Sequence, residues 1–347
     1  MIRHPTVIWI ILLYVAFSLW SLPLKKVSDS PPESTPQSEA KVVKLPLSGP
    51  ASHFRAELSG MAWYGDILIL LPQFPERFGE ADEGAVFGLY KQDILDYLDG
   101  IVTKPLRPFT IPIEMKAVKS QIQGYEGFES IAFSGETVYL TIEASPRAMM
   151  GYVVMGNIQQ KPLEIHLDPA KLVNVTPQAR LPNLSDEALL VYQGLIYTFY
   201  EANGKKANPS PVAHRFSLDL QPQGTVPFPT IEYRLSDASP PDDNGQFWVV
   251  NDYFPVDMFN LRPQLDPLVM KYGEGPSHRD NWTVERLALL QITPQGIRLA
   301  DRPPVQLYLW DTFTNRNWEA IALLDDRGFL LATDMVPGTI LGFVPLK

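Results

Sequence analysis

Acidic residues recur at one spacing in this sequence, and carboxylates gathered in that way are suited to binding a divalent cation. Glu129 and Glu143 lie 14 positions apart, at the two ends of an apolar segment with a Gly-containing turn at its centre, and Glu187 and Glu201 repeat the arrangement. Carboxylates held close together repel one another and stay ionised together only beside a counter-cation. A hard ion such as Ca²⁺, which accepts several oxygen ligands in a flexible cage, is the natural partner.

Three further copies of the pattern are less regular. Ser59–Gln73 has Ser and Gln at its ends, with Glu57 just upstream. Glu319–Asp334 is one residue longer, and two prolines interrupt the first half of Asp237–Asn251. Recurrence at one spacing indicates an internal structural repeat.

Each copy is predicted to be a β-hairpin, because two apolar segments flank a tight turn. Positions equally far from the turn of an antiparallel hairpin face one another at its open end. The first-strand glutamates are therefore the main candidate ligands, with the second-strand acids in support. The predicted metal ligands are Glu57, Glu129, Glu143, Glu187, Glu201, Asp237, Glu319 and Asp334. The alternative is that these carboxylates only accept hydrogen bonds from the backbone of neighbouring strands.

Basic residues follow the same hairpins. Arg147 and Lys205 each lie four positions beyond the last glutamate of a hairpin, and Arg316 lies just before Glu319. Such residues would hold the phosphate of a small substrate over a metal ion, as in a metal-dependent hydrolase of phosphate esters or anhydrides. The alternative is that they are ordinary solvated charges on a non-catalytic module, in which the ion is structural and the loops bind a protein partner. No nucleophile or base is evident, so catalytic residues stay unassigned.

Composition excludes several other kinds of site. The chain has no cysteine, and its five histidines lack zinc-binding spacing, which argues against thiolate and zinc centres. Its net charge of −10 argues against nucleic acid as a partner, because phosphate contacts need clustered Lys and Arg.

The elements that would position these residues are short strands. Each hairpin is followed by further strand-like segments, and four-stranded units arranged radially make a β-propeller. The sequence predicts an all-β propeller of five blades, and the long stretch 252–316 leaves six open. Only one strand, 339–344, follows the last hairpin, so residues 41–47 are expected to pair with it and close the ring. Residues 91–99 are predicted to form a short helix.

The N-terminal residues predict export. An apolar run from Thr6 to Trp20 lies between Arg3 and Lys25-Lys26, which is typical of a signal peptide or a retained signal-anchor over residues 1–26. Residues 27–40 are polar and predict a flexible stalk. The domain of residues 41–347 is thus expected outside the cytoplasm, either secreted or anchored to the membrane by its N-terminal segment.

The hairpin from Asn317 to Asp334, together with Glu57–Ala62 and Glu129–Glu143, resembles the repeats of the esterase-like phytase domain family. The likeness extends in order over residues 41–347 and implies an exported propeller with phosphoesterase-like activity. Ala188 and Ala320 stand where that family has Gly after the Glu, and the Asp237 copy is degenerate, which puts a complete ligand ring in doubt. A more distant resemblance to the calcium-activated apyrases implies an axial Ca²⁺.

Overall fold

A computed structural model describes residues 37–80, 83–309, 316–334 and 338–346. The predicted signal or anchor segment and most of the predicted stalk lie outside these ranges. The described residues form many strands and a few short helices, so the predicted all-β class is confirmed. Within these ranges, no helix is long and apolar enough to cross a membrane.

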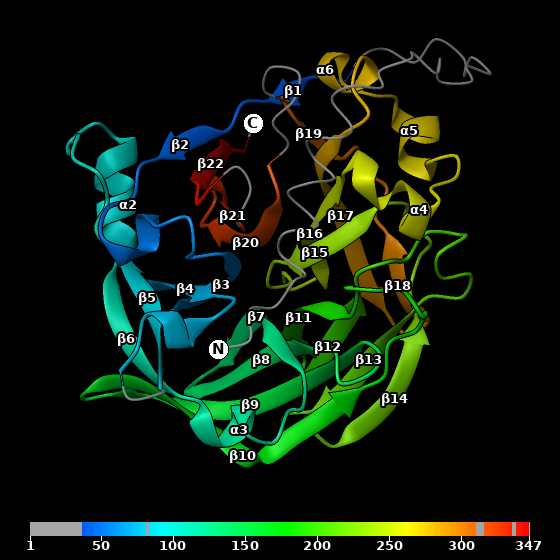
Figure 1. The fold of residues 1–347 in the computed structure, drawn as a ribbon. Helices are drawn as coiled ribbons and strands as arrows, with labels where there is room; N and C mark the ends of the chain where they lie inside the picture. Colours follow the sequence, from blue (N-terminus) through cyan, green and yellow to red (C-terminus); the bar gives the residue numbers. More distant parts are fainter. Residues whose placement is uncertain (1–36, 81–82, 310–315, 335–337, 347) are drawn as a thin grey trace, which may run out of the picture. The chain divides into compact units, whose positions relative to one another are not determined.

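The strands form four hydrogen-bonded sheets, the largest of which has eight strands (Figure 1). Its two antiparallel halves are joined edge to edge by a parallel pairing in which Ile165 lies opposite Ile113. In spatial order its strands are β3 (Leu58–Tyr64), β4 (Ile67–Pro72), β5 (Gly84–Tyr90), β6 (Phe109–Glu114), β10 (Leu163–Val175), β9 (Met150–Gln160), β8 (Thr137–Ala144) and β7 (Tyr125–Ser134).

The remaining three sheets contain four, six and four strands. The first of them consists of β11 (Asp186–Tyr192), β12 (Leu195–Tyr200), β13 (Val212–Ser217) and β14 (Pro222–Pro227). The second consists of β1 (Glu39–Ala40), β19 (Val305–Leu307), β17 (Val284–Thr293), β16 (Gln246–Tyr253) and β15 (Arg234–Ala238), with β18 (Gly296–Leu299) paired to β17. The third consists of β2 (Val43–Leu45), β22 (Leu341–Pro345), β21 (Gly328–Thr333) and β20 (Trp318–Leu324).

The five predicted hairpins are present as β3–β4, β7–β8, β11–β12, β15–β16 and β20–β21. In β11–β12 the two turn residues, Gln193 and Gly194, both have positive φ, as the tightest hairpin turns require. The first strands contact one another in cyclic order: β3 with β7, β7 with β11, β11 with β15, β15 with β20, and β20 with β3. The open ends of the hairpins are therefore gathered together.

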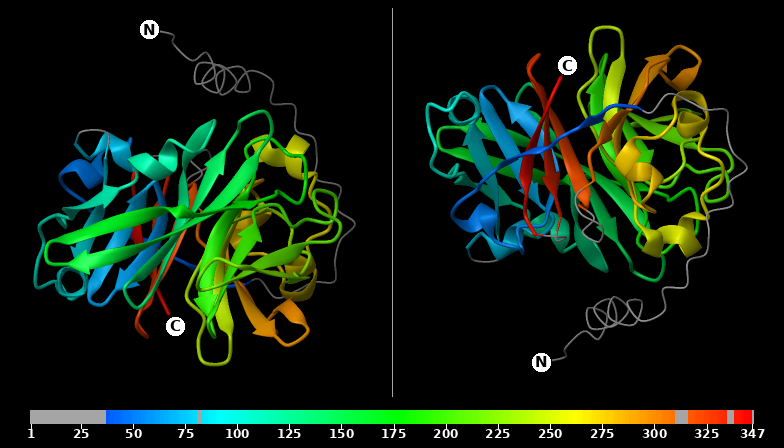
Figure 2. Two further views of the ribbon diagram at one scale, coloured as in Figure 1. Left: turned by 90° about the horizontal axis from the view of Figure 1, so that it is seen from below. Right: turned by 90° about the horizontal axis from the view of Figure 1, so that it is seen from above.

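The N-terminal strands join two sheets. Val43 in β2 pairs with Phe343 in β22, so the predicted pairing of residues 41–47 with 339–344 is observed. Just before it, Glu39 and Ala40 form β1 and pair in parallel with β19. These two residues were expected to end the flexible stalk. The blue segment in the right view of Figure 2 runs from one sheet to the other.

The long stretch after β16 supplies no separate sheet among the residues described there. It contains the helices α4 (Met258–Leu261), α5 (Pro267–Tyr272) and α6 (Pro276–Arg279), followed by strands that extend the β15–β16 sheet. The predicted helix over 91–99 is α2 (Lys91–Leu98), and a further short helix, α3, spans Lys116–Lys119.

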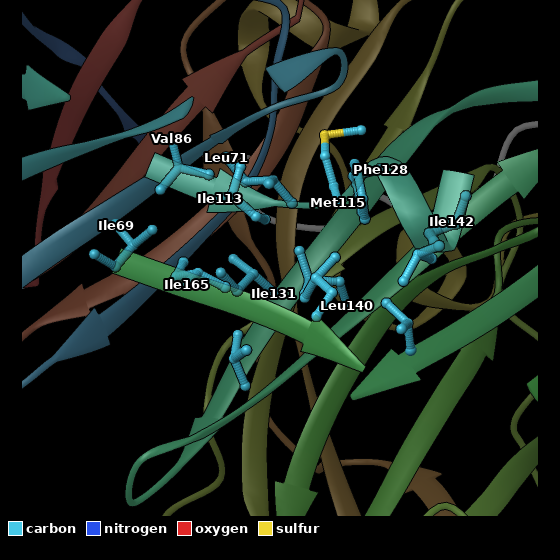
Figure 3. Packing of buried hydrophobic residues seen from close by; sticks show 14 of the residues in the cluster. Ile69, Leu71, Val86, Ile113, Met115, Phe128, Ile131, Leu140, Ile142 and Ile165 are labelled. Atoms are coloured by element: carbon cyan, nitrogen blue, oxygen red, sulfur yellow. The ribbon is translucent and has the colours of Figure 1, made fainter. Parts of the chain in front are cut away.

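Hydrophobic side chains fill the space between the two halves of the eight-stranded sheet (Figure 3). Ile69 and Val86 from one half and Ile131 and Leu140 from the other all lie in one buried cluster. Burying each such side chain stabilises the fold by about 1.5–3 kcal/mol. This packing fixes the hairpins that carry the acidic residues.

Candidate functional site

A β-bulge occurs at one equivalent place in the first strand of every hairpin, and in three hairpins it holds a predicted glutamate. In β11–β12, Asp186 pairs with Tyr200 and Ala188 with Phe199, so Glu187 is an extra residue in its strand. A bulge bends the strand and re-aims the side chain that it carries. The register shifts at the corresponding places in the other hairpins, at Ser59, Glu129–Ser130, Ser236–Asp237 and Glu319.

Six acidic side chains and one arginine gather at the open ends of these hairpins, and none of the six acids is more than 8% exposed. Glu129, Glu187 and Glu319 come from the bulges, whereas the other three acids lie at the ends of the second strands. We call this group the acidic cluster, which consists of Glu129, Glu143, Glu187, Glu201, Asp252, Glu319 and Arg234.

Arg234 is the cation of the acidic cluster and begins strand β15. Its Nε contacts Oε1 of Glu201, and its Nη2 lies 3.8 Å from Oε1 of both Glu187 and Glu319. One guanidinium therefore faces carboxylates from two sheets other than its own. Sequence reasoning missed this residue, although Arg234 precedes the bulge residue Ser236 by two positions, as Glu57 precedes Ser59.

The carboxyl groups of the cluster have raised pKa values. Burial, followed by the charge of Glu143, raises the pKa of Glu129. Burial and then Glu201 raise the pKa of Glu187, and Arg234 opposes that change. Burial raises the pKa of Glu143 to about 7. One arginine is too little positive charge to keep all six acids ionised.

Several carboxylate oxygens of the cluster are buried and accept no hydrogen bond from the described protein. They are Oε1 of Glu143, Oε2 of Glu187, Oε2 of Glu201 and Oδ2 of Asp252. A buried polar atom without a partner is costly, so each of these oxygens needs a proton or a cation beside it.

The donor chemistry of the cluster suits a hard cation, since all its candidate ligands are carboxylate oxygens. However, no three acidic or histidine side chains among the described residues are arranged around a common point as ready-made metal ligands. The cluster thus contains possible oxygen ligands, three of which lie beside Arg234, and not a preformed metal site.

Two predicted ligands have other partners. Asp237 accepts hydrogen bonds from Oγ of Ser130 and from the backbone N–H of Ile321, both at 2.9 Å, and so links β15 to β7 and β20. Its assignment as a ligand is corrected, because Ser236 occupies the position equivalent to the glutamates. The carboxylate of Glu57 forms an ion pair with Arg77.

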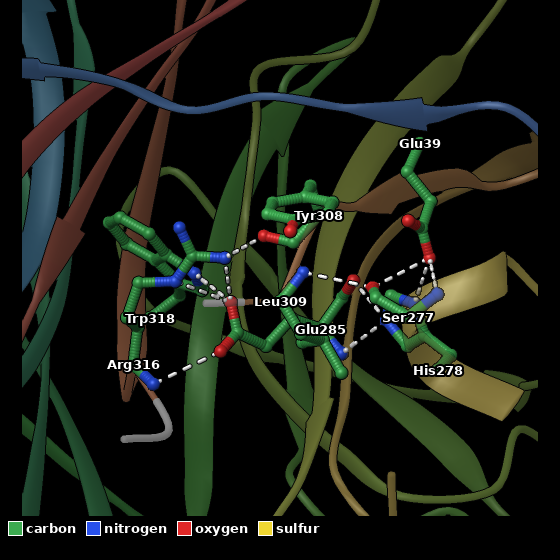
Figure 4. A network of polar contacts seen from close by, with 8 residues as sticks. All are labelled: Glu39, Ser277, His278, Glu285, Tyr308, Leu309, Arg316 and Trp318. Atoms are coloured by element: carbon green, nitrogen blue, oxygen red, sulfur yellow. Dashed lines mark hydrogen bonds and ion pairs between the residues drawn. The ribbon is translucent and has the colours of Figure 1, made fainter. Parts of the chain in front are cut away.

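Arg316 does not face a substrate, which corrects its predicted role. Its side chain is fully buried, and its Nε and backbone N–H donate to the carboxylate of Glu285 at 2.8 and 3.0 Å (Figure 4). Trp318 Nε1 donates to the same carboxylate at 2.8 Å. In the same figure, the carboxylate of Glu39 lies within hydrogen-bonding distance of Ser277 and His278.

The other predicted residues lie where a role in binding remains a prediction. Arg147 and Lys205 are exposed. Asp334 is partly buried, and its charge raises the pKa of Glu129, as a smaller cause than burial and the charges of Glu143 and Glu319.

No sequence-family model matches the chain, and no curated protein matches it. Among solved structures, it is similar to glutaminyl cyclase from Myxococcus xanthus, with 9% identity over 89% of this chain and 100% of that chain and a TM-score of 0.42. The GH43_1 enzyme from Xanthomonas citri matches with 12% identity over 89% of this chain and 91% of that chain, at a TM-score of 0.47. The soluble aldose sugar dehydrogenase from Escherichia coli matches with 9% identity over 88% of this chain and 99% of that chain, at a TM-score of 0.44. Similarities at this level transfer no function, and the resemblance to esterase-like phytase domains stays a prediction.

Proposed function

We propose that the described unit is a five-bladed β-propeller that binds a divalent cation, with Ca²⁺ the best candidate, at the acidic cluster. The observation that carries this proposal is the imbalance of charge: among the described residues, six buried acids face one arginine, and four of their oxygens accept no hydrogen bond from a protein donor. The cyclic contacts of the five first strands and the pairing of β2 with β22 support the blade number and the closure. The N-terminal sequence supports a place outside the cytoplasm.

The bulge residues are the ones that an ion would meet first. Glu129, Glu187 and Glu319 are 7%, 5% and 8% exposed, whereas Glu143 and Glu201, at 3% and 0%, lie deeper. Bound Ca²⁺ would supply the positive charge that the cluster lacks. The carboxylates of Glu129, Glu187 and Glu319 would hold it, and because they come from three sheets, binding would tie those sheets together.

A second candidate function, phosphoester hydrolysis, is favoured by the position of Arg234. Its side chain is 13% exposed and its Nη2 stands 3.8 Å from two carboxylates, farther than a hydrogen bond. This guanidinium nitrogen would be able to turn to a phosphoryl oxygen beside the ion. Arg147 and Lys205 are proposed to bind the same substrate from exposed loops. Without turnover, the same site would serve a module that binds a protein partner.

Calorimetric titration of the purified protein with Ca²⁺ tests the binding site. Glu187→Gln and Glu319→Gln should each weaken Ca²⁺ binding about tenfold or more, which is about 1.4 kcal/mol, because each removes one ligand charge. Binding should strengthen as the pH rises past about 7, where Glu143 loses its proton. Glu114→Gln is the matched control, because the Glu114 carboxylate is 63% exposed and lies at the end of β6, outside the acidic cluster. Equal Ca²⁺ affinities for the parent and both cluster variants would contradict the proposal.

A panel of phosphomonoesters, phosphodiesters and nucleotides tests the second candidate. Arg147→Ala and Lys205→Ala should lower a Ca²⁺-dependent rate about 10²-fold or more while leaving Ca²⁺ affinity unchanged, since both residues would contact substrate only. A protein that binds Ca²⁺ and cleaves none of these compounds is a binding module.

A further inference from the structure

A pocket of about 380 Å³ lies at the turn ends of three hairpins. Of its lining residues, Trp63 lies next to the turn of β3–β4, Asp242 in the turn of β15–β16, and Asp325 in the turn of β20–β21. The acidic cluster lies at the open ends of the hairpins, so this pocket is at their opposite ends. We call it the turn-end pocket, and its lining includes Trp63, Asp242, Gln246, Trp248, Arg302 and Asp325.

Two tryptophans form much of the apolar part of the turn-end pocket, and the fold fixes both. Nε1 of Trp63 donates a hydrogen bond to the carbonyl of Leu323 at 2.6 Å, which ties β3 to β20. Trp248 packs edge-on against Phe329, with 5.1 Å between the ring centroids. Its backbone N–H donates to Oγ of Ser239 at 3.0 Å. Both indole rings are therefore held in place before a ligand binds, which reduces the cost of ordering them.

The polar side chains of the lining provide both donors and acceptors. Oδ1 of Asp242 accepts from the backbone N–H groups of Asn244 and Gln246, at 2.9 and 2.8 Å, so this carboxylate is held in its turn. The amide of Gln246 has two N–H donors and an acceptor oxygen, and the guanidinium of Arg302 has only donors. Hydroxyl groups both donate and accept, so a ligand rich in hydroxyls suits this set.

The charges of the turn-end pocket balance. Its carboxylates belong to Asp242 and Asp325, and its cation is Arg302. Nζ of Lys91 pairs with Oδ1 of Asp325 at 2.8 Å and supplies a second positive charge. Because binding sites are complementary in charge to their ligands, this balance favours a neutral ligand over an anion or a cation.

The chain's own cations lie over both indole rings. Nζ of Lys91 is 4.9 Å from the ring centroid of Trp63, and the guanidinium carbon of Arg302 is 5.2 Å from that of Trp248. Asp325 holds Lys91 in its place, whereas Arg302 is exposed and forms no ion pair among the described residues. A cation–π contact at an exposed site is weak, so Arg302 can move aside and leave a ring face for an apolar surface of the ligand.

We propose that the turn-end pocket binds a neutral mono- or disaccharide. The C–H face of the sugar stacks on Trp63 and Trp248, and its hydroxyls pair with Asp242, Gln246 and Arg302. The volume of about 380 Å³ lies in the range of about 300–1,000 Å³ that small-molecule sites occupy. This binding needs no cation in the acidic cluster, so it stands or falls separately from the proposed function.

Saturation-transfer NMR on the full chain, titrated in the presence of EDTA, tests the site. The compounds are glucose, galactose, xylose, maltose and cellobiose, with tetramethylammonium as a cationic comparison. At least one sugar should receive saturation, most strongly at its ring C–H protons. Trp63→Ala should weaken its binding about tenfold or more. Trp282→Ala is the matched control and should leave binding unchanged, because Trp282 is 54% exposed and lies outside the pocket.

Gln246→Ala is the deciding variant, because the Gln246 side chain forms no hydrogen bond within the described residues and its loss leaves the fold intact. It should weaken sugar binding about threefold to tenfold, as expected for one lost hydrogen bond. An affinity unchanged by Gln246→Ala would overturn the proposal, since the sugar would then bind elsewhere. Saturation transfer to none of the sugars, or to tetramethylammonium alone, would also overturn it.

Discussion

The buried carboxylate of Glu285 and those of the acidic cluster differ in the donors that each receives. Glu285 accepts hydrogen bonds from the backbone N–H and Nε of Arg316 and from Nε1 of Trp318, at 2.8–3.0 Å. In the acidic cluster six carboxyl groups share one guanidinium, and four of their oxygens accept no hydrogen bond from the described protein. Both regions are buried and both sit where strands from different sheets meet.

The Glu285 carboxylate is therefore a structural charge that stabilises the fold. The carboxyl groups of the acidic cluster are in excess of the positive charge beside them. A buried carboxylate that faces its own arginine is matched in charge, and removing either partner leaves an unpaired charge. A group of buried acids in excess of its cations is incomplete, and protons or a bound cation must balance it. Three measurements distinguish the two regions.

The largest effect is expected in the Glu285 region. Arg316→Met leaves the Glu285 carboxylate buried without its cation and should lower the free energy of unfolding by about 3–5 kcal/mol. Chemical denaturation followed by tryptophan fluorescence measures this. Arg327→Met is the control, since the pair of Arg327 with Asp99 lies at the surface and its loss should change stability far less. Equal losses of stability in the two variants would contradict a tight buried ion pair between Arg316 and Glu285.

The acidic cluster should make metal-free protein less stable as the pH rises. Its carboxyl groups have higher pKa values in the folded state than in the unfolded state, so the folded state binds more protons between the two values. For Glu143, stability should fall between about pH 4.5 and about pH 7, by about 3 kcal/mol in all. Denaturation at several pH values, with and without Ca²⁺, measures this. Glu143→Gln should flatten the profile, and a stability that rises over this range in the parent would contradict the account of the cluster.

The smallest effect is expected from removing one charge from the acidic cluster. Glu187→Gln should leave the free energy of unfolding at pH 7 unchanged or slightly higher, within about 1 kcal/mol, because it relieves repulsion from Glu201. The matched change Glu285→Gln should instead cost about 3–5 kcal/mol, since it leaves Arg316 as a buried charge without its counter-ion. If the two substitutions destabilise equally, the comparison between the regions fails.

Local patterns in the sequence were enough to predict the hairpins and helix α2. The two-residue turns and the apolar alternation are properties of neighbouring residues. The pairing of residues 41–47 with 339–344 also followed, because the last hairpin had too few strands after it. These predictions depend on counting strands and not on knowing their exact register.

The details of the site depend on register, which the sequence did not reveal. A bulge shifts which residue faces the centre, so Asp237 was taken for a ligand when Ser236 holds the equivalent place. Arg234 was missed because the broken repeat hid its alignment with Glu57. Arg316 was placed by its distance along the chain from Glu319, whereas its side chain turns to Glu285 on another strand.

The end of the stalk was placed too late by composition alone. Glu39 follows a polar stretch and has no apolar neighbours before it, yet its carboxylate is bound by Ser277 and His278. Those partners lie more than 200 residues further along the chain, where no local pattern can point to them.

The pairing of β2 with β22 also has a consequence for how the protein is made. Val43 meets Phe343, a partner 300 residues later in the chain. At about 5–20 residues per second, a ribosome needs on the order of 15–60 s to supply that partner. During this time the strand around Val43 has no place in a sheet, and the contact is among the slowest kind to form because its loop is so long. The strand around Val43 therefore stays unpaired while about 300 further residues are made, and this step of folding must wait until β22 has left the ribosome.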